Sequence, residues 1–430
     1  MTQTRKENPF YVGGPVPPRY FVGRGSEVNI AFDQISNGSH LALWGGPGMG
    51  KSSFLRFIAE PQTWIDRQYD HSQALIVLLN CSTINPFTPG AFWREILSKL
   101  REKVEGNVAL RSPIEVILQQ LSIQKSDVQR VLRLIGQQQQ FLVLLLDDYH
   151  AALVANANYT EEEMTNFLSE FRNLAINGEE SRYLSTIVTS LRRLNELGPE
   201  IKFNASPWYN HYLFQPLKPF TQNDVASWFY LSDRITQELH DGVHEVAGQH
   251  PALLQTAYYL LYNNLRTGQV PEVEAFFRNF ESATKHFLRD MWVFSSPDEQ
   301  VLMMLIALSK LEGRLNRKRK YDLGDMDLIF SQRNRELRDL EERGLITYKV
   351  EQGKFAIAFT SSLMEWWVIK EIENSSTTTE LVTREKVMLN LMSRKQAEKI
   401  KTVMVQVWEH QDTIQSIVGW VSKLVSALSV

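Results

Sequence analysis

The sequence predicts an α/β fold built on a five-stranded parallel sheet and followed by helical regions, and three observations lead to this prediction. Five short apolar runs, near residues 40, 75, 141, 184 and 211, alternate with segments of helical spacing. A glycine-rich loop at 45–52 separates the first run from the first helix, and the pair Asp147-Asp148 ends the third run. Parallel strands joined by helices bring such a loop and such acids to one edge of a sheet.

The glycine-rich loop fits the spacing G-x-x-x-x-G-K-[ST] without a mismatch. Its residues are Gly45, Gly46, Pro47, Gly48, Met49, Gly50, Lys51 and Ser52, and Ser53 follows. An apolar strand at 40–44 precedes the loop and a helix at 53–60 follows it, which is the setting that this motif requires. Backbone N–H groups would surround phosphates at the helix N-terminus, Lys51 would reach the outer phosphates and Ser52 would be a ligand of Mg²⁺. The loop therefore predicts a site for ATP or ADP with Mg²⁺.

The acidic pair follows the apolar run 141–146, so we expect it beside the loop at the carboxyl edge of the sheet. Asp147 is expected to organise Mg²⁺, and Asp148 to polarise the attacking water. Unpaired acids in an apolar setting cost several kcal/mol, which favours a functional role. Many related ATPases carry glutamate where this chain has Asp148. Aspartate is one methylene shorter and would hold the water less well, so slow turnover is expected.

Composition limits the kinds of partner. The chain has 430 residues, a formal net charge of −3 and 43% hydrophobic residues, which suits about three domains and gives no global reason to expect nucleic acid. The single cysteine, Cys81, excludes an internal disulfide and is expected to be a buried apolar residue. No signal-like segment and no run of eighteen apolar residues is present, so the expected location is the cytoplasm.

Two further elements suggest a family. Tyr20-Phe21-Val22-Gly23-Arg24 lies shortly before the loop, and the Gly-x-x-Pro sequence 248–251 interrupts a helical pattern at 221–287. Together with the loop and the acids, this order resembles the STAND ATPases, with a NACHT-like or archaeal-ATPase-like core of the additional-strand P-loop type. The resemblance covers residues 20–260. It implies that the backbone at Phe21 and Val22 borders adenine and that Pro251 packs on it.

The same resemblance assigns roles at the end of the strand 184–189. Thr189 or Ser190 takes the sensor position facing the γ-phosphate, and Arg192 or Arg193 takes that of the following arginine, with Arg192 as the candidate catalytic residue. A solvated basic turn is the alternative. Arg24 is expected to order its own turn, although it belongs to the candidate nucleotide-binding residues, and His250 is expected to be a local turn residue.

Residues 297–372 have the pattern of a winged helix. The expected elements are helices at 297–309, 326–330 and 334–343, a hairpin of strands 345–350 and 355–359, and a closing helix at 363–372. On the recognition helix, four basic residues are offset by four acidic ones: Arg333, Arg335, Arg338 and Arg343 against Glu336, Asp339, Glu341 and Glu342. One basic cluster, Arg314, Arg317, Lys318, Arg319 and Lys320, is expected to be a solvated loop. DNA binding is therefore not favoured.

The last fifty residues lie outside the resemblance. Residues 374–379 read as a polar linker, and 393–411 and 413–430 as two helical patterns. Apolar residues of the second pattern fall on one stripe: Ile414, Ile417, Val418, Val421, Leu424, Val425 and Leu428. Such a stripe could dock on the rest of the chain, join copies of itself, or contact an effector or a membrane interface.

The expected domains are an extended N-terminal arm at 1–19, a P-loop ATPase domain at 20–217, a helical lid at 218–290, a winged helix at 291–373, and a linker with amphipathic helices at 374–430. The resemblance implies an ATP-dependent signalling switch that hydrolyses ATP slowly, opens with the bound nucleotide and forms homo-oligomers, in bacterial defence or in a programmed response. The alternatives are a DNA-associated AAA+ ATPase and a nucleotide-binding scaffold with little hydrolysis.

Overall fold

The computed structural model describes residues 8–200, 206–229, 235–268, 273–311, 326–351, 354–374, 387–388, 391–392 and 400. The chain folds into two compact units. One contains Pro15–Gly46 and Gly50–Leu217, and the other contains Met1–Gly14, Pro47–Met49 and Lys218–Val430. The basic cluster at 314–320, the turn at 352–353 and the amphipathic stripe at 414–428 lie outside the described residues.

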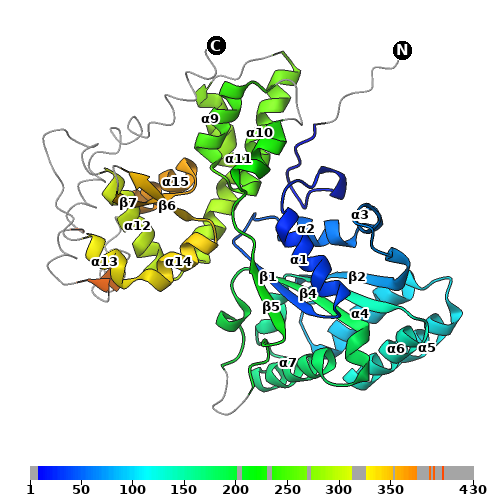
Figure 1. The fold of residues 1–430 in the computed structure, drawn as a ribbon. Coiled ribbons are helices and arrows are strands. Elements are labelled where there is room, and N and C mark those ends of the chain that lie inside the picture. The colour runs from blue at the N-terminus through cyan, green and yellow to red at the C-terminus, as the bar shows by residue number, and fades with distance from the viewer. Residues whose placement is uncertain are drawn as a thin grey trace, which may run out of the picture. The chain divides into compact units, whose positions relative to one another are not determined.

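The first unit is built on a five-stranded sheet in the order β2-β3-β4-β1-β5 (Figure 1). The strands are β1 (His40–Trp44), β2 (Ala74–Asn80), β3 (Phe141–Asp147), β4 (Leu184–Ser190) and β5 (Tyr212–Pro216). All neighbouring pairs are parallel. Strand β4 lies between the loop-bearing β1 and the acid-bearing β3, which confirms the additional-strand arrangement expected from the sequence.

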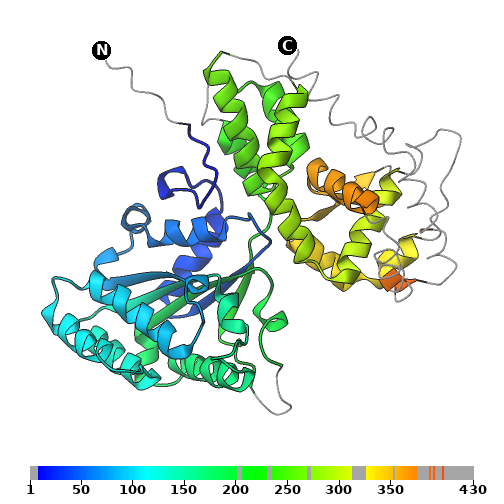
Figure 2. The ribbon, with the colours of Figure 1, turned by 180° about the vertical axis from the view of Figure 1, so that it is seen from behind.

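Helices cover both faces of this sheet (Figures 1 and 2). Helices α1 (Gly25–Ser36), α2 (Lys51–Ala59) and α3 (Pro61–Asp66) lie on one side, and α4 (Pro89–Lys103), α5 (Val108–Leu118), α6 (Lys125–Gln137) and α7 (Glu161–Ile176) lie on the other. Residues 142, 144 and 146 of β3 pack in the cluster formed with α4–α7, while Val143 and Leu145 are buried on the opposite face. Burial on both faces explains why the strands read as unbroken apolar runs.

One helix was placed wrongly from the sequence. The spacing of apolar residues after Pro113 predicts a helix at 113–122, but the observed helix is Val108–Leu118, because Asn107 caps it by accepting a hydrogen bond from Leu110 N at 3.3 Å. Pro113 therefore lies inside the helix and not at its start. The strands and α2 agree with the expected ones to within a few residues, whereas α3 was not expected.

The second unit begins with helices α8 (Gln222–Phe229), α9 (Gln237–Ala247), α10 (Pro251–Arg266) and α11 (Val273–Val293). They are followed by α12 (Pro297–Leu311), α13 (Met326–Gln332), α14 (Asn334–Glu342), the antiparallel strands β6 (Ile346–Glu351) and β7 (Lys354–Phe359), and α15 (Ser362–Asn374). This order is the one expected for residues 297–372, whose assignment as a winged helix remains a prediction. No helix in the described ranges is long and apolar enough to cross a membrane.

The N-terminal arm differs from expectation. The sequence predicted an extended arm on the surface, but Phe10 is only 1% exposed and packs among aromatic side chains of the helical region. Residues 8–17 form no helix or strand, as proline and glycine predicted, and a short 3-10 helix follows at Pro18–Tyr20. The burial of Phe10 depends on aromatic side chains that come much later in the sequence.

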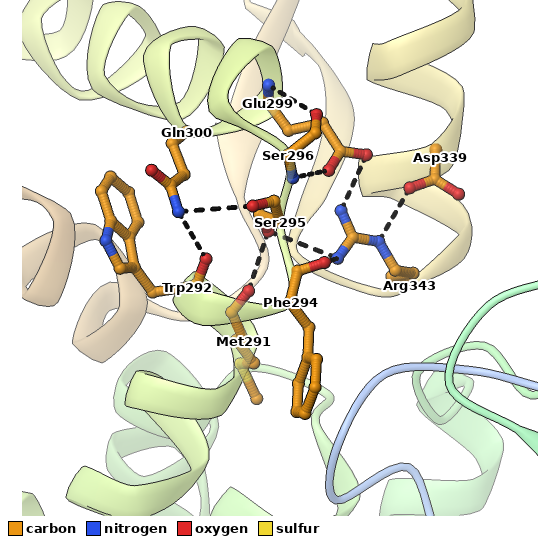
Figure 3. Close-up of polar contacts among 9 residues, drawn as sticks. All are labelled: Met291, Trp292, Phe294, Ser295, Ser296, Glu299, Gln300, Asp339 and Arg343. Atoms are coloured by element: carbon orange, nitrogen blue, oxygen red, sulfur yellow. Dashed lines mark hydrogen bonds and ion pairs between the residues drawn. The ribbon is translucent and has the colours of Figure 1, made fainter. Parts of the chain in front are cut away.

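A buried ion-pair cluster links α14 to the start of α12 (Figure 3). Arg343, at the end of α14, pairs with Glu299 and Asp339 at 2.9 Å each, and its Nη1 donates to Ser295 Oγ at 3.3 Å and to the Phe294 carbonyl at 3.4 Å. The side chain of Arg343 is 2% exposed. Arg343 and Asp339 pair with each other, so the charges that remain on the expected recognition helix still balance, with three basic and three acidic residues.

Candidate functional site

The glycine-rich loop leaves the carboxyl end of β1 and enters α2. Gly45 N donates to Ser190 O at 3.3 Å, which holds the start of the loop against the end of β4. Gly48 and Gly50 have φ angles of +75° and +89°, in the left-handed region that favours glycine. Gly50 is the N-cap of α2, so the loop ends where the free N–H groups of a helix can bind an anion.

Lys51 is folded back onto its own loop. Its Nζ donates to the carbonyls of Gly45 at 2.8 Å and Gly46 at 3.0 Å. Burial lowers the pKa of Lys51 to about 8, although the nearby carboxylates of Asp148 and Asp147 act in the opposite direction. A phosphate could replace the two carbonyls as the partner of this ammonium group, which is buried and ready to pair with an anion.

The acidic pair is held by the neighbouring strand. Asp147 Oδ1 accepts hydrogen bonds from Thr189 Oγ1 at 2.6 Å and from Asp148 N at 3.2 Å. Asp148 N lies 3.1 Å from Thr189 Oγ1 as well, and the residue has a φ of +49°. The unusual backbone conformation of Asp148 turns the chain sharply after β3, so consecutive carboxylates leave the strand in different directions.

A third strand contributes a residue that the sequence analysis did not single out. Asn80, the last residue of β2, donates from Nδ2 to Asp148 Oδ2 at 3.1 Å. In the parallel register of β2 and β3, Asn80 lies opposite Asp147. The signal was present, since Asn80 is the polar residue that ends an apolar strand at the same edge as the acids. Asn80, Asp148, Asp147 and Thr189 form one chain of hydrogen bonds across β2, β3 and β4, in which the backbone N–H of Asp148 joins the two acids.

The polar and basic residues at the end of β4 and just after it have different partners. Ser190 Oγ donates to the carbonyl of Arg192 at 2.5 Å, so its hydroxyl stabilises the turn. The sensor role of Thr189 or Ser190 remains a prediction. The guanidinium of Arg193 lies 4.9 Å from the centre of the Trp44 ring, a cation–π distance. A catalytic role for Arg192 remains a prediction.

The candidate nucleotide-binding residues that precede the glycine-rich loop lie against α1 and α2. The Phe21 ring stacks on Phe57 with centroids 4.4 Å apart. Arg24 has a φ of +64° and pairs with Glu27 at 3.3 Å at the start of α1. Val22 is half-buried, and Pro251 is a buried residue that opens α10 in the other unit. The adenine contacts of Phe21, Val22 and Pro251 remain predictions.

Two titratable side chains lie near the acids. Burial raises the pKa of the Cys81 thiol, as expected for a cysteine that packs as an apolar residue. Burial lowers the pKa of His150, while Asp148 acts in the opposite direction. His150 is a second residue near the site that the sequence analysis did not select.

The donor set fits Mg²⁺. In the described ranges, no three His, Cys, Asp or Glu side chains gather as metal ligands. Mg²⁺ in nucleotide sites takes only one or two protein ligands and completes its shell with phosphate and water, so Ser52 and Asp147 suffice. Both hydrogen bonds to Asp147 use Oδ1, and Oδ2 is the atom that could hold a metal-bound water.

A glycine loop between strand and helix, an acid-ended strand two places away and one strand between them define a P-loop nucleoside triphosphatase. Residues 34–197 match the family model described as AAA domain. The chain therefore contains a AAA-type P-loop ATPase domain, a broader class than the STAND group that the motifs resemble.

Two solved structures are similar to most of the chain. The Walker-type ATPase PABY2304 of Pyrococcus abyssi is 15% identical, covers 84% of this chain and 99% of its own, and has a TM-score of 0.51, which supports the fold. The Aeropyrum pernix ORC2 protein, with ADPNP and ADP, is 11% identical over 86% of this chain and 99% of its own, with a TM-score of 0.49. No curated protein matches the sequence significantly.

Proposed function

We propose that the protein is an ATP-dependent switch that binds Mg-ATP at residues 45–53 and hydrolyses it slowly. The observation that supports this proposal best is the hydrogen-bonded chain from Asn80 through Asp148 and Asp147 to Thr189, at the strand ends beside the loop. A structural role alone does not explain why three neighbouring strands end in polar residues that orient two acids.

The residues then have separate roles. Lys51 pairs with the outer phosphates, and Ser52 with Asp147 holds Mg²⁺, which neutralises phosphate charge. Asp148 orients and polarises the attacking water, and Asn80 fixes the carboxylate that does so. Asp148 is shorter than the glutamate common in related ATPases, and one of its oxygens is bound by an amide, so slow turnover is expected.

The roles of the two acids are separable by mutation. Asp148→Asn should bind Mg-ATP within about twofold of wild type and lower kcat by about 10²-fold or more, because it removes the base but keeps the shape. Asp147→Asn should instead weaken the Mg²⁺ dependence of ATP binding. Calorimetry with and without Mg²⁺, together with phosphate release, measures both; identical behaviour of the two variants would contradict this division.

The switch itself is proposed on the STAND resemblance of residues 20–260. ADP would favour a closed monomer, whereas ATP would open the chain and let nucleotide domains assemble. Each nucleotide can shift this equilibrium only by the difference between its affinities for the closed and the open state. The size distribution in ADP and in a slowly hydrolysed ATP analogue tests this. Equal distributions, with tight nucleotide retention and no phosphate release, would favour a nucleotide-binding scaffold.

A DNA-associated ATPase is a second candidate, supported by one observation. On α14 the side chains of Arg335 and Arg338 are exposed, whereas Arg343 is buried and Arg333 pairs with Glu336 at 3.6 Å. Arg335 and Arg338 are therefore the exposed basic side chains of this helix, although Glu341 and Glu342 balance their charge. Retention on duplex DNA that falls with salt, and falls again in Arg335→Ala/Arg338→Ala, would favour this candidate; no retention at low salt would exclude it.

A further inference from the structure

The middle of the glycine-rich loop, Pro47–Met49, is part of the second unit and packs on the start of α10. A Cβ built on Gly48 would lie 2.7 Å from both the Ala252 Cβ and the His250 Cε1 atoms. No side chain fits at so close an approach, and the φ of +75° also favours glycine. Gly48 therefore allows the backbone of the loop to reach α10.

Two carbonyl groups of the loop are held by the first residues of this helix. Ala252 N donates to Gly48 O at 3.2 Å, and His250 Nε2 lies 3.1 Å from Pro47 O. A carbonyl oxygen only accepts, so Nε2 carries a proton and donates it to the loop. His250 Nδ1 accepts from Leu253 N at 3.4 Å, which makes His250 the N-cap of α10. The side chain is 2% exposed, so this local turn residue also fixes a distant backbone group.

The direction of the two carbonyls determines the direction of the next two amides. In a trans peptide unit the C=O and N–H groups lie in one plane and point in opposite directions. The peptide bonds after Pro47 and Gly48 are trans, and their carbonyls face α10. The N–H groups of Gly48 and Met49 are therefore turned away from the helix. Successive N–H groups on one side of a loop form the concavity in which such loops bind an anion.

We propose that His250 is a positioning residue of the nucleotide site: its Nε2–H holds the Pro47 carbonyl on α10 and so directs the amides of Gly48 and Met49 toward a phosphate before nucleotide binds. The inference rests on the proposed function, since it assumes that ADP and ATP bind at residues 45–53. A loop that is ordered in advance loses less conformational entropy on binding, which raises the affinity. By linkage, bound nucleotide strengthens the contact between the loop and α10 to the same extent.

The test separates the two hydrogen bonds of His250. His250→Asn keeps an acceptor near the position of Nδ1, and asparagine is a preferred N-cap, but it has no atom at the position of Nε2. Its Kd for ADP, measured by calorimetry, should rise about 3- to 10-fold, the effect of one ordinary hydrogen bond. His250→Ala should raise the Kd by a similar factor and should also lower the midpoint of urea unfolding, because the cap is lost as well.

His286→Asn is the matched control, since it makes the same substitution at an exposed histidine of α11. Its Kd for ADP should equal that of wild type. Circular dichroism of the variants shows whether the fold is kept. A wild-type Kd in His250→Asn would show that His250 acts only as a helix cap, and the positioning role would be wrong.

Hydrogen exchange tests the same contact without any substitution. The amide of Ala252 donates to Gly48 O, so its exchange reports on the docking of the loop. Saturating ADP should slow the exchange of this amide in wild type, and should slow it less in His250→Asn. Equal exchange with and without ADP, in protein that binds ADP by calorimetry, would overturn the inference.

The outcomes distinguish this inference from the proposed function. If wild type binds ADP and His250→Asn binds it equally well, the positioning role fails and the nucleotide site stands. If wild type binds no nucleotide by calorimetry, the proposed function itself fails.

Discussion

At the scale of single residues, Lys51 makes hydrogen bonds within the glycine-rich loop that a bound phosphate would replace. Lys51 is buried, which lowers the pKa of its ammonium group, and it donates to two carbonyls of its own loop. Charge-assisted hydrogen bonds to a phosphate are stronger than bonds to neutral carbonyls. Nucleotide binding should therefore redirect the ammonium group outward.

Lys51→Ala should lower the affinity for ATP and ADP strongly. Hydrogen bonds to a charged group contribute roughly 1.5–3 kcal/mol, which corresponds to roughly a 10- to 150-fold increase in Kd. Calorimetric titration measures this, with circular dichroism to show that the fold is kept. An unchanged Kd would mean that the nucleotide does not bind at this loop.

At the scale of elements, the end of α14 is joined to α12 by a largely buried charge cluster. Glu299 also caps its own helix, since its carboxylate accepts from Ser296 N at 2.6 Å, while Ser296 Oγ accepts from Glu299 N at 3.3 Å. One guanidinium thus serves two carboxylates and the turn before α12 (Figure 3). Loss of Arg343 would leave both carboxylates without their counter-charge.

Arg343→Met should lower the free energy of unfolding of the second unit by roughly 3–5 kcal/mol, the usual cost of breaking a buried pair. Adding Glu299→Gln should restore part of the loss, because one uncompensated carboxylate is then removed. Urea unfolding followed by tryptophan fluorescence measures both. Arg335→Ala, an exposed change on the same helix, is the control and should stay within about 0.5 kcal/mol of wild type.

At the scale of the whole molecule, the two edges of the sheet have different chemistry. The carboxyl edge holds the loop and the acids, and the amino edge holds His40 and His211, whose rings lie 5.3 Å apart. Burial, and then His40 and Arg172, lower the pKa of His211 to about 3, and burial lowers the pKa of His40 although it pairs with Ala175 O at 3.1 Å. Both histidines are therefore neutral in the folded protein at neutral pH.

Acid should destabilise the first unit through these residues. The unfolded chain takes up a proton near pH 6.5 and the folded His211 only near pH 3, so stability is complete above pH 6.5 and falls as the pH is lowered toward 3. Each site contributes a slope of up to about 1.4 kcal/mol per pH unit. Urea unfolding between pH 7 and 4.5 should show a smaller slope in His211→Phe; an equal slope would show that His211 does not contribute.

The amphipathic stripe at 414–428 is expected to be the output element of the switch, although it lies outside the described residues. A chain truncated after Gln411 should bind and hydrolyse ATP as before but lose assembly or partner binding in the ATP state. Phosphate release and size distribution measure the two properties separately. Insolubility or loss of nucleotide binding would show instead that the stripe packs on the rest of the chain.

The sequence by itself determined the loop, its position between strand and helix, the acid pair and the parallel sheet with one added strand. These features depend on residue spacing along one segment and on apolar runs buried on both faces, so they can be predicted locally. The comparisons support the AAA-type P-loop class, while the STAND assignment and the domain boundaries remain proposals.

Only the tertiary structure decided that Asn80 bonds Asp148, that Thr189 rather than Ser190 meets Asp147, that Arg343 is buried and that Phe10 fills a pocket. Each of these depends on a partner from another strand or from a helix distant in the chain. The residues next to it in the sequence do not identify that partner, because the fold decides which groups come close enough to satisfy a hydrogen bond or a buried charge.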